Sequence, residues 1–234
     1  MITARPIIDA SPGSPSLLAG LPTTLLSRLF AGATSHRVMT DKPLFHVGDP
    51  GDGCYRLDKG LLRVVVESRD GEELVIAFLG PGAMVGELAM IDGLPRSATA
   101  VAVKACELSF ITSQAFNESL RAQPELYRCL VEALAARLRE TTDALAAASF
   151  LNSQGRLARV LLDLAALLGE DSGNGGIVLA HEIRQRDLAA MAGIARENAS
   201  RIMGEWKRRE LVTRLSDRYC INNVAELKRE MESS

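Results

Sequence analysis

Glycine turns divide the chain between about Ser35 and Thr112, and glycine is then absent as far as Leu151. In the first stretch it recurs beside Asp or Pro, in "VGDPGDG", "DKG", "RDGEE", "GPGAMVG" and "DGLPR". Short segments rich in β-forming residues lie between these turns, such as "LLRVVVES", "ELVIAFL" and "ATAVAV". Many short strands joined by glycine turns are typical of an antiparallel barrel or sandwich. We therefore expect an all-β domain here.

A helical period replaces the turns from Gln114 to about Leu151, which predicts one long helix. Its apolar positions recur at steps of four or three, the spacing of a coiled-coil seam. The seam needs a partner, which is either the core of its own domain or a second copy of the chain. Its members are Leu126, Leu130, Leu134, Leu138, Thr141 and Leu145.

The last third of the chain reads as a winged helix-turn-helix. A helix through Leu157 and Leu168 precedes the glycine-rich loop "GEDSGNGG" and a short strand "IVLA". Two helical segments, around "RDLAAMAG" and "RENASRIMGEWKRREL", are joined by a turn at Gly193, and "LVTRLSDRYCIN" reads as a β-hairpin. Helix, glycine turn, helix and hairpin in this order define the motif.

The composition is that of a soluble globular protein of one or two domains. The 234 residues are 47% hydrophobic and 24% charged, with a formal charge of −2. We expect a cytoplasmic location with no membrane contact, because no apolar run is long enough to cross a bilayer and the N-terminus lacks a basic segment followed by an apolar signal core. The four cysteines form no C-x-x-C and there are three histidines, so no metal site is expected.

An acid and a base stand nine residues apart in "GELAMIDGLPRSATA", within small and apolar residues. Charged side chains are rarely buried without a partner, so Glu87 and Arg96 either pair with each other or hold a polar ligand. Gly86 before a short helical stretch would present free backbone N–H groups to an anion, and Arg96 and Ser97 would add donors. Glu87 suits a sugar hydroxyl beside a phosphate. The set therefore favours a nucleotide, with a structural Glu87–Arg96 ion pair as the alternative.

The second helix of the predicted helix-turn-helix begins with Arg196 and Glu197, and Arg201 follows on the same face. The first residues of such a helix meet base edges, where Arg suits guanine and a carboxylate accepts from cytosine. The alternative is an exposed Glu197–Arg201 ion pair. The run Arg184, Gln185 and Arg186 would hold DNA phosphates, or is a solvated charge run. From 182 to 218 nine basic residues stand against six acidic ones.

The order of a glycine-turned β-roll, "GEL" with "PRSATA", a seam helix and a winged helix with "RENASR" resembles the cyclic AMP receptor protein branch of the CRP/FNR bacterial transcription regulators. The resemblance covers about residues 20 to 225. It implies an α+β fold, with an antiparallel, jelly-roll-like β-roll, a dimerisation helix and a C-terminal winged helix-turn-helix. It divides the chain into a flexible tail (1–20), the β-roll (21–124), the helix and hinge (125–151) and the DNA-binding domain (152–234).

The same resemblance implies a role for each matching residue. Glu87 would accept from the ribose 2′-hydroxyl, and Thr141 and Thr142, one from each subunit, would meet the adenine. Arg137 would stand by the ribose. The implied ligand set is Gly86, Glu87, Leu88, Arg96, Ser97, Arg137, Thr141 and Thr142. The implied DNA set is Arg184, Gln185, Arg186, Arg196, Glu197, Ser200 and Arg201.

The implied partners are cyclic AMP as effector, double-stranded DNA with TGTGA-like half-sites, RNA polymerase and a second copy of the chain. A two-fold dimer would set its recognition helices about 34 Å apart. The loop "GEDSGNGGIV" is longer than in the family's namesake, so a polymerase contact there does not carry over.

Three alternatives stay open. Cyclic GMP could be the ligand or a competitor, because a Thr hydroxyl both donates and accepts. The chain could be a ligand-independent regulator of the same family. A cupin-type metalloenzyme with a DNA-binding tail is the third, although such sites use an H-x-H pair that this chain lacks.

Overall fold

The computed structural model describes residues 27–173 and 175–232, so the predicted tail (1–20) lies outside the described residues. The first domain is an open antiparallel sheet with strand order β1-β6-β3-β4, in which β2 pairs with β6 and β5 pairs with β3. The all-β prediction is confirmed, but a closed barrel is wrong, because in the described chain β1 and β4 end the path unpaired with each other. The strands are β1 (Thr34–Val38), β2 (Pro43–Phe45), β3 (Gly53–Glu67), β4 (Glu73–Leu79), β5 (Met84–Val85) and β6 (Thr99–Thr112).

Strands β3 and β6 form the long ladder of this domain, from Gly53 opposite Thr112 to Val65 opposite Thr99. The register shifts around Gly60, which has a φ of 101°. A Cβ added there would lie 2.4 Å from the carbonyl oxygen of Ala105, so only glycine fits. The glycine of "DKG" therefore marks a bulge within a strand pair, where a turn was expected.

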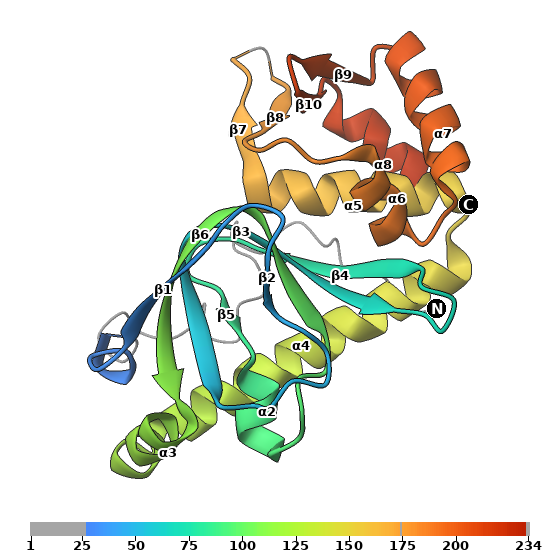
Figure 1. The fold of residues 1–234 in the computed structure, drawn as a ribbon. Helices are drawn as coiled ribbons and strands as arrows, with labels where there is room; N and C mark the ends of the chain where they lie inside the picture. Colours follow the sequence, from blue (N-terminus) through green and yellow to red (C-terminus); the bar gives the residue numbers. More distant parts are fainter. Residues whose placement is uncertain (1–26, 174, 233–234) are drawn as a thin grey trace.

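The single helix predicted from Gln114 is two helices, α3 (Ser113–Ala122) and α4 (Glu125–Phe150). The Thr112 side chain caps α3 by accepting from the N–H of Ala115. Pro124 separates the two, because proline disfavours the helical conformation at the residue before it and has no N–H to donate. The helical period alone overlooked this stop signal, whereas the division implied by the family resemblance started the long helix at 125. Helix α4 then runs along the β-domain toward the start of α5 (Figure 1).

The predicted seam of α4 has two different environments. Leu126 and Leu130 are buried in the core of the β-domain, together with Phe116 and Leu120 of α3. Leu138 and Leu145, further along the helix, are each 68% exposed. The first half of α4 therefore covers its own domain, while the second half leaves an apolar stripe uncovered. Although α4 has 26 residues, no helix in the described part of the chain is long and apolar enough to cross a membrane.

The second domain has the predicted helix-turn-helix followed by a hairpin. Helix α5 is capped by Asn152, whose side chain accepts from the N–H groups of Gln154 and Gly155. Strand β7 and helix α8 were not predicted. The elements are α5 (Ser153–Leu168), β7 (Gly169–Asp171), β8 (Ile177–Leu179), α6 (Gln185–Ala192), α7 (Arg196–Arg208), β9 (Val212–Leu215), β10 (Arg218–Ile221) and α8 (Val224–Glu232).

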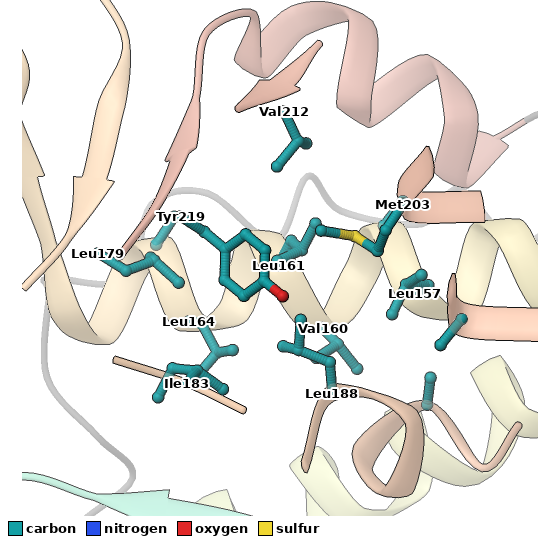
Figure 2. Close-up of a cluster of buried hydrophobic side chains, with 14 of the residues drawn as sticks. Leu157, Val160, Leu161, Leu164, Leu179, Ile183, Leu188, Met203, Val212 and Tyr219 are labelled. Carbon is teal, nitrogen blue, oxygen red and sulfur yellow. The ribbon is translucent and has the colours of Figure 1, made fainter. Parts of the chain in front are cut away.

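The core of this domain is built on one face of α5, where Leu157, Leu161 and Leu164 are fully buried (Figure 2). The same cluster of buried side chains continues into the β-domain through Val75 and Phe78 of β4. The second domain is therefore packed against the sheet, with α6 beside β4 (Figure 1).

Candidate ligand pocket and DNA-binding surface

A pocket of about 90 Å³ opens where helix α2 (Glu87–Asp92) meets the sheet. Glu87 is 5% exposed and Arg96 is 3% exposed, so the structure buries both charges of the motif. Ser97 and Leu88 are more exposed and stand at the rim. The pocket is lined by Phe45, Val64, Ile76, Leu79, Met84, Val85, Gly86, Glu87, Leu88, Ala89, Arg96, Ser97 and Ala98.

The guanidinium of Arg96 is held from three sides. Its Nη1 donates to the carbonyl oxygen of Gly86 at 2.6 Å, and its Nη2 donates to Oδ1 of Asp52 at 2.9 Å. The guanidinium carbon lies 4.5 Å from the centre of the Phe45 ring, a cation–π contact. Its Nε is buried and has no hydrogen-bond partner among the described residues. A buried, unpaired N–H on a charged group is costly unless an acceptor reaches it.

The sequence left open an ion pair between Arg96 and Glu87. The carboxylate that pairs with Arg96 in the structure is that of Asp52. Asp52 lies in the loop before β3. The backbone of this loop is tied to Arg96, which donates its N–H to Asp49 and accepts from Gly48. Asp52 and Phe45 were not predicted from the sequence. The available signal for Asp52 was its acidic side chain within "GDPGDG", and this stretch was interpreted only as a turn.

Gly86 is required by the position of the guanidinium. It has a φ of 86°, and a Cβ built on it would lie 2.2 Å from Nη1 of Arg96. Any other residue would be strained and would collide with the arginine. The spacing between "GE" and "RS" is thus a packing requirement as well as a chemical pattern.

Cys54 lies next to both motif charges. Burial raises the pKa of its thiol, the negative charge of Glu87 raises it further, and the positive charge of Arg96 opposes them. The thiol is therefore protonated and unreactive in this fold, as expected of a buried cysteine.

The α4 residues of the predicted ligand set do not line this pocket. Thr141 and Thr142 are both exposed on the second half of the helix, and the hydroxyl of Thr142 donates to the carbonyl oxygen of Leu138 at 2.9 Å. Arg137 belongs to α4, but its side chain lies outside the described part of the structure. Within one chain the structure brings Gly86, Glu87, Leu88, Arg96 and Ser97 together, without the threonines.

Helix α7 presents the predicted base-reading residues to solvent. Its inner face, with Ala199, Ile202 and Trp206, is fully buried. Among the described residues no ion pair joins Glu197 to Arg201, so the exposed pair considered as an alternative is not formed. The four predicted residues of this helix, Arg196, Glu197, Ser200 and Arg201, are all exposed.

The basic run before α6 is arranged differently from the prediction. Helix α6 already begins at Gln185, so Gln185 and Arg186 lie in its first turn. Arg184 stands just outside, and its Nη1 and Nη2 donate to the two carboxylate oxygens of Asp41 at 3.0 and 2.8 Å. Arg184 is therefore partly exposed to solvent but is also bound to the β-domain, which neither interpretation of the sequence included.

The two domains match two family models. Residues 35–123 match the cyclic nucleotide-binding domain, and residues 155–230 match the Crp-like helix-turn-helix domain. A chain that joins these two domains is a cyclic nucleotide-binding transcription regulator.

Comparison with individual proteins gives the same answer. A CRP-like cAMP-activated global transcriptional regulator of Mycobacterium tuberculosis is 30% identical over 166 residues, which are 71% of this chain and 74% of the relative. The cyclic AMP receptor protein of Thermus thermophilus is 35% identical over 162 residues, 69% of this chain and 71% of that protein. The chain belongs to the CRP/FNR family of transcription regulators, as its motifs predicted.

A solved structure shows the same fold at lower identity. The c-di-GMP responsive global regulator CLP of Xanthomonas campestris superposes with a TM-score of 0.73 at 22% identity, covering 86% of this chain and 100% of that one. Members of the family are transcription regulators and not enzymes, which removes the cupin-type alternative.

Proposed function

We propose that this protein is a dimeric transcription regulator that binds cyclic AMP in the α2 pocket and then a palindrome with TGTGA-like half-sites. The observation that carries the effector site is the buried Arg96, whose Nε has no acceptor in the described structure. An anionic phosphate supplies such an acceptor. The names of the two relatives, cAMP-activated regulator and cyclic AMP receptor protein, support the choice of nucleotide.

The residues at the pocket suit the parts of a cyclic nucleotide. Arg96 and the rim hydroxyl of Ser97 would hold the phosphate, with Gly86 close beside it, and the Glu87 carboxylate would accept from the ribose hydroxyl. At about 90 Å³ the cavity is smaller than the ~300 Å³ or more of a pocket that encloses a whole drug-sized ligand. Only the phosphate and ribose would lie inside, and the base would extend past Leu88.

The dimer and the coupling between sites are part of this proposal. The uncovered stripe of α4 would pack against the same stripe of a second copy, which would set Thr141 and Thr142 where a projecting base can meet them, with Arg137 nearby. Helix α4 ends at Phe150 and only Leu151 and Asn152 separate it from α5. A change in the pairing of α4 would therefore reorient the DNA-binding domain at this short hinge. Once bound to DNA, the dimer would contact RNA polymerase.

We expect Arg196→Ala to relax base preference at one guanine of each half-site, at a cost of about 1 to 3 kcal/mol. Arg196 is exposed in the first turn of α7, where a bidentate contact with guanine is lost on truncation. Binding-site selection with the purified protein measures the preference. Arg208→Ala removes the same charge from the other end of α7 and should leave the preferred sequence unchanged. An unaltered preference in Arg196→Ala would contradict the assignment.

Calorimetry with cyclic AMP and cyclic GMP, each followed by a DNA shift assay on a TGTGA-N6-TCACA duplex, tests the proposal. Binding and a shift with cyclic AMP alone support it. If both nucleotides bind and only one promotes the shift, discrimination lies after binding. Binding of neither would leave a regulator whose DNA affinity is independent of cyclic nucleotides, against the proposal.

A further inference from the structure

The DNA-binding domain is tied to the β-domain by a charge pair between residues 143 positions apart in the chain. Arg184, which immediately precedes α6, uses both terminal nitrogens on both oxygens of Asp41 in the turn between β1 and β2. Their side chains are 44% and 56% exposed, so water and ions reach the pair. Such a contact is weak enough to open and specific enough to hold one geometry.

The turn that carries Asp41 is built to present the carboxylate. Asp41 has a φ of 61°, a left-handed conformation that costs energy for most residues and least for Asp, Asn and Gly. Its N–H donates to the carbonyl oxygen of Ala102 at 2.8 Å, and Ala102 donates back to Lys42 at 2.9 Å. The turn is thus fixed to β6, and Asp41 faces Arg184 without needing to reorganise.

A second ion pair joins the same two domains, and its residue in α6 lies three positions after Arg184. Arg63 of β3 lies 3.4 Å from the carboxylate of Asp187 in α6, and also contacts Glu73 of β4 at 2.7 Å. Both Arg63 and Asp187 are largely buried. A cleft of about 370 Å³ lies between the domains here, lined by Asp41, Arg63, Lys104, Arg184, Asp187 and Arg218 among others. The start of α6 is therefore held to the sheet at two points.

Arg184 has a second candidate partner. In a helix-turn-helix the first helix crosses the DNA backbone, and basic groups at its start contact phosphates. A carboxylate and a phosphate present the same pair of oxygens to a guanidinium, so Asp41 and DNA compete for one side chain.

We propose that Asp41 acts as a stand-in for a DNA phosphate, forming a latch with Arg184 that holds the DNA-binding domain on the β-domain when no DNA is bound. This inference rests on the proposed DNA-binding function and adds a restraint within the chain. Opening the latch frees Arg184 for the DNA backbone, and the energy of the Asp41 contact opposes binding until the domains separate.

The test is Asp41→Asn, which removes the charge, keeps the shape and tolerates the left-handed turn. Without cyclic nucleotide, the variant should bind the palindrome about two- to five-fold more tightly than the parent chain. With saturating cyclic AMP the two should differ less, because the effector reorients the DNA-binding domain in the proposed mechanism and so already weakens the Asp41–Arg184 contact. The control is Asp70→Asn, which removes the same charge from the exposed β3–β4 turn. An equal gain in DNA affinity in the two variants would show that the effect comes from net charge alone, and would overturn the proposal of a latch.

Hydrogen exchange on the free protein separates failure of the latch from failure of the DNA-binding proposal. The N–H groups of Asp187 and Leu188 donate to the carbonyl oxygen of Arg184, so they report on the start of α6. These amides should exchange faster in Asp41→Asn than in Asp70→Asn, whether or not any variant binds the palindrome. Unchanged exchange in Asp41→Asn would overturn the latch independently of the DNA result.

Discussion

Replacing Arg96 with glutamine should weaken the binding of cyclic AMP by about 30-fold or more, because removing one partner of a buried charged contact costs about 2 to 5 kcal/mol. Arg96 is the buried cation of the pocket, and its orientation is set by Gly86, Asp52 and Phe45. Glutamine keeps part of the side-chain volume but has neither the charge nor the fork of donors. Calorimetry of the variant against the parent chain measures the loss.

Two further variants separate ligand binding from folding. Arg96→Lys keeps the charge but loses the fork, and should bind with intermediate affinity. Asp52→Asn leaves Arg96 in place and removes the carboxylate that occupies Nη2, so it should bind cyclic AMP at least as tightly as the parent. Thermal unfolding of each variant shows whether the fold survives. Normal affinity in a folded Arg96→Gln variant would rule out this pocket as the nucleotide site.

The pocket illustrates what a single sequence can and cannot predict. Glu87 and Arg96 were identifiable because charges within an apolar run need a partner, and both prove to be buried. Asp52 was not, because it lies 44 positions from Arg96 and reaches it only through the pairing of the 48–49 loop with the Arg96 backbone. Nothing local distinguishes that aspartate from the other acidic turn residues around it.

The helices show the same division between local signals and tertiary structure. Apolar residues every four or three positions predict an apolar face along α4. The same spacing includes Leu130, which is buried in its own domain, and Leu138, which is exposed. The position of the sheet decides how far along α4 these side chains are buried against the β-domain. Strand β7 was missed because its three exposed residues, Gly169 to Asp171, show no strand pattern and pair only because β8 lies beside them.

The interdomain contact was beyond prediction for a related reason. Asp41 and Arg184 each look like an ordinary exposed charge, in a turn and before a helix. Their meeting depends on how β4 packs against the second domain through Val75 and Phe78. A residue assigned to DNA phosphates from its position in a helix-turn-helix therefore has an intramolecular partner as well.

Introducing a charge into the uncovered stripe of α4 should have the largest effect on DNA binding. Leu138 and Leu145 are seven residues apart, Val131 lies seven before Leu138, and all three are exposed in the single chain. Such a seven-residue repeat places side chains along the seam of a two-stranded coil, where Leu138→Glu would bury two like charges against each other. We expect the variant to be a monomer in analytical ultracentrifugation and to lose binding of the palindrome by at least about 100-fold, since one half-site remains per molecule.

The matched control for this change is Ala136→Glu, which adds the same charge to an exposed position of the same helix. At 3.6 residues per turn, position 136 lies on nearly the opposite side of α4 from position 138. This variant should remain dimeric and bind DNA almost as the parent does.

Leu138 is not part of the β-domain core, so Leu138→Glu should leave the Arg96 pocket intact. Calorimetry should therefore still detect cyclic AMP binding, with a lower affinity because the contacts from the second copy's α4 are lost. A dimeric Leu138→Glu variant with normal DNA affinity would show that the chain associates through another surface, and that the stripe on α4 has a different partner.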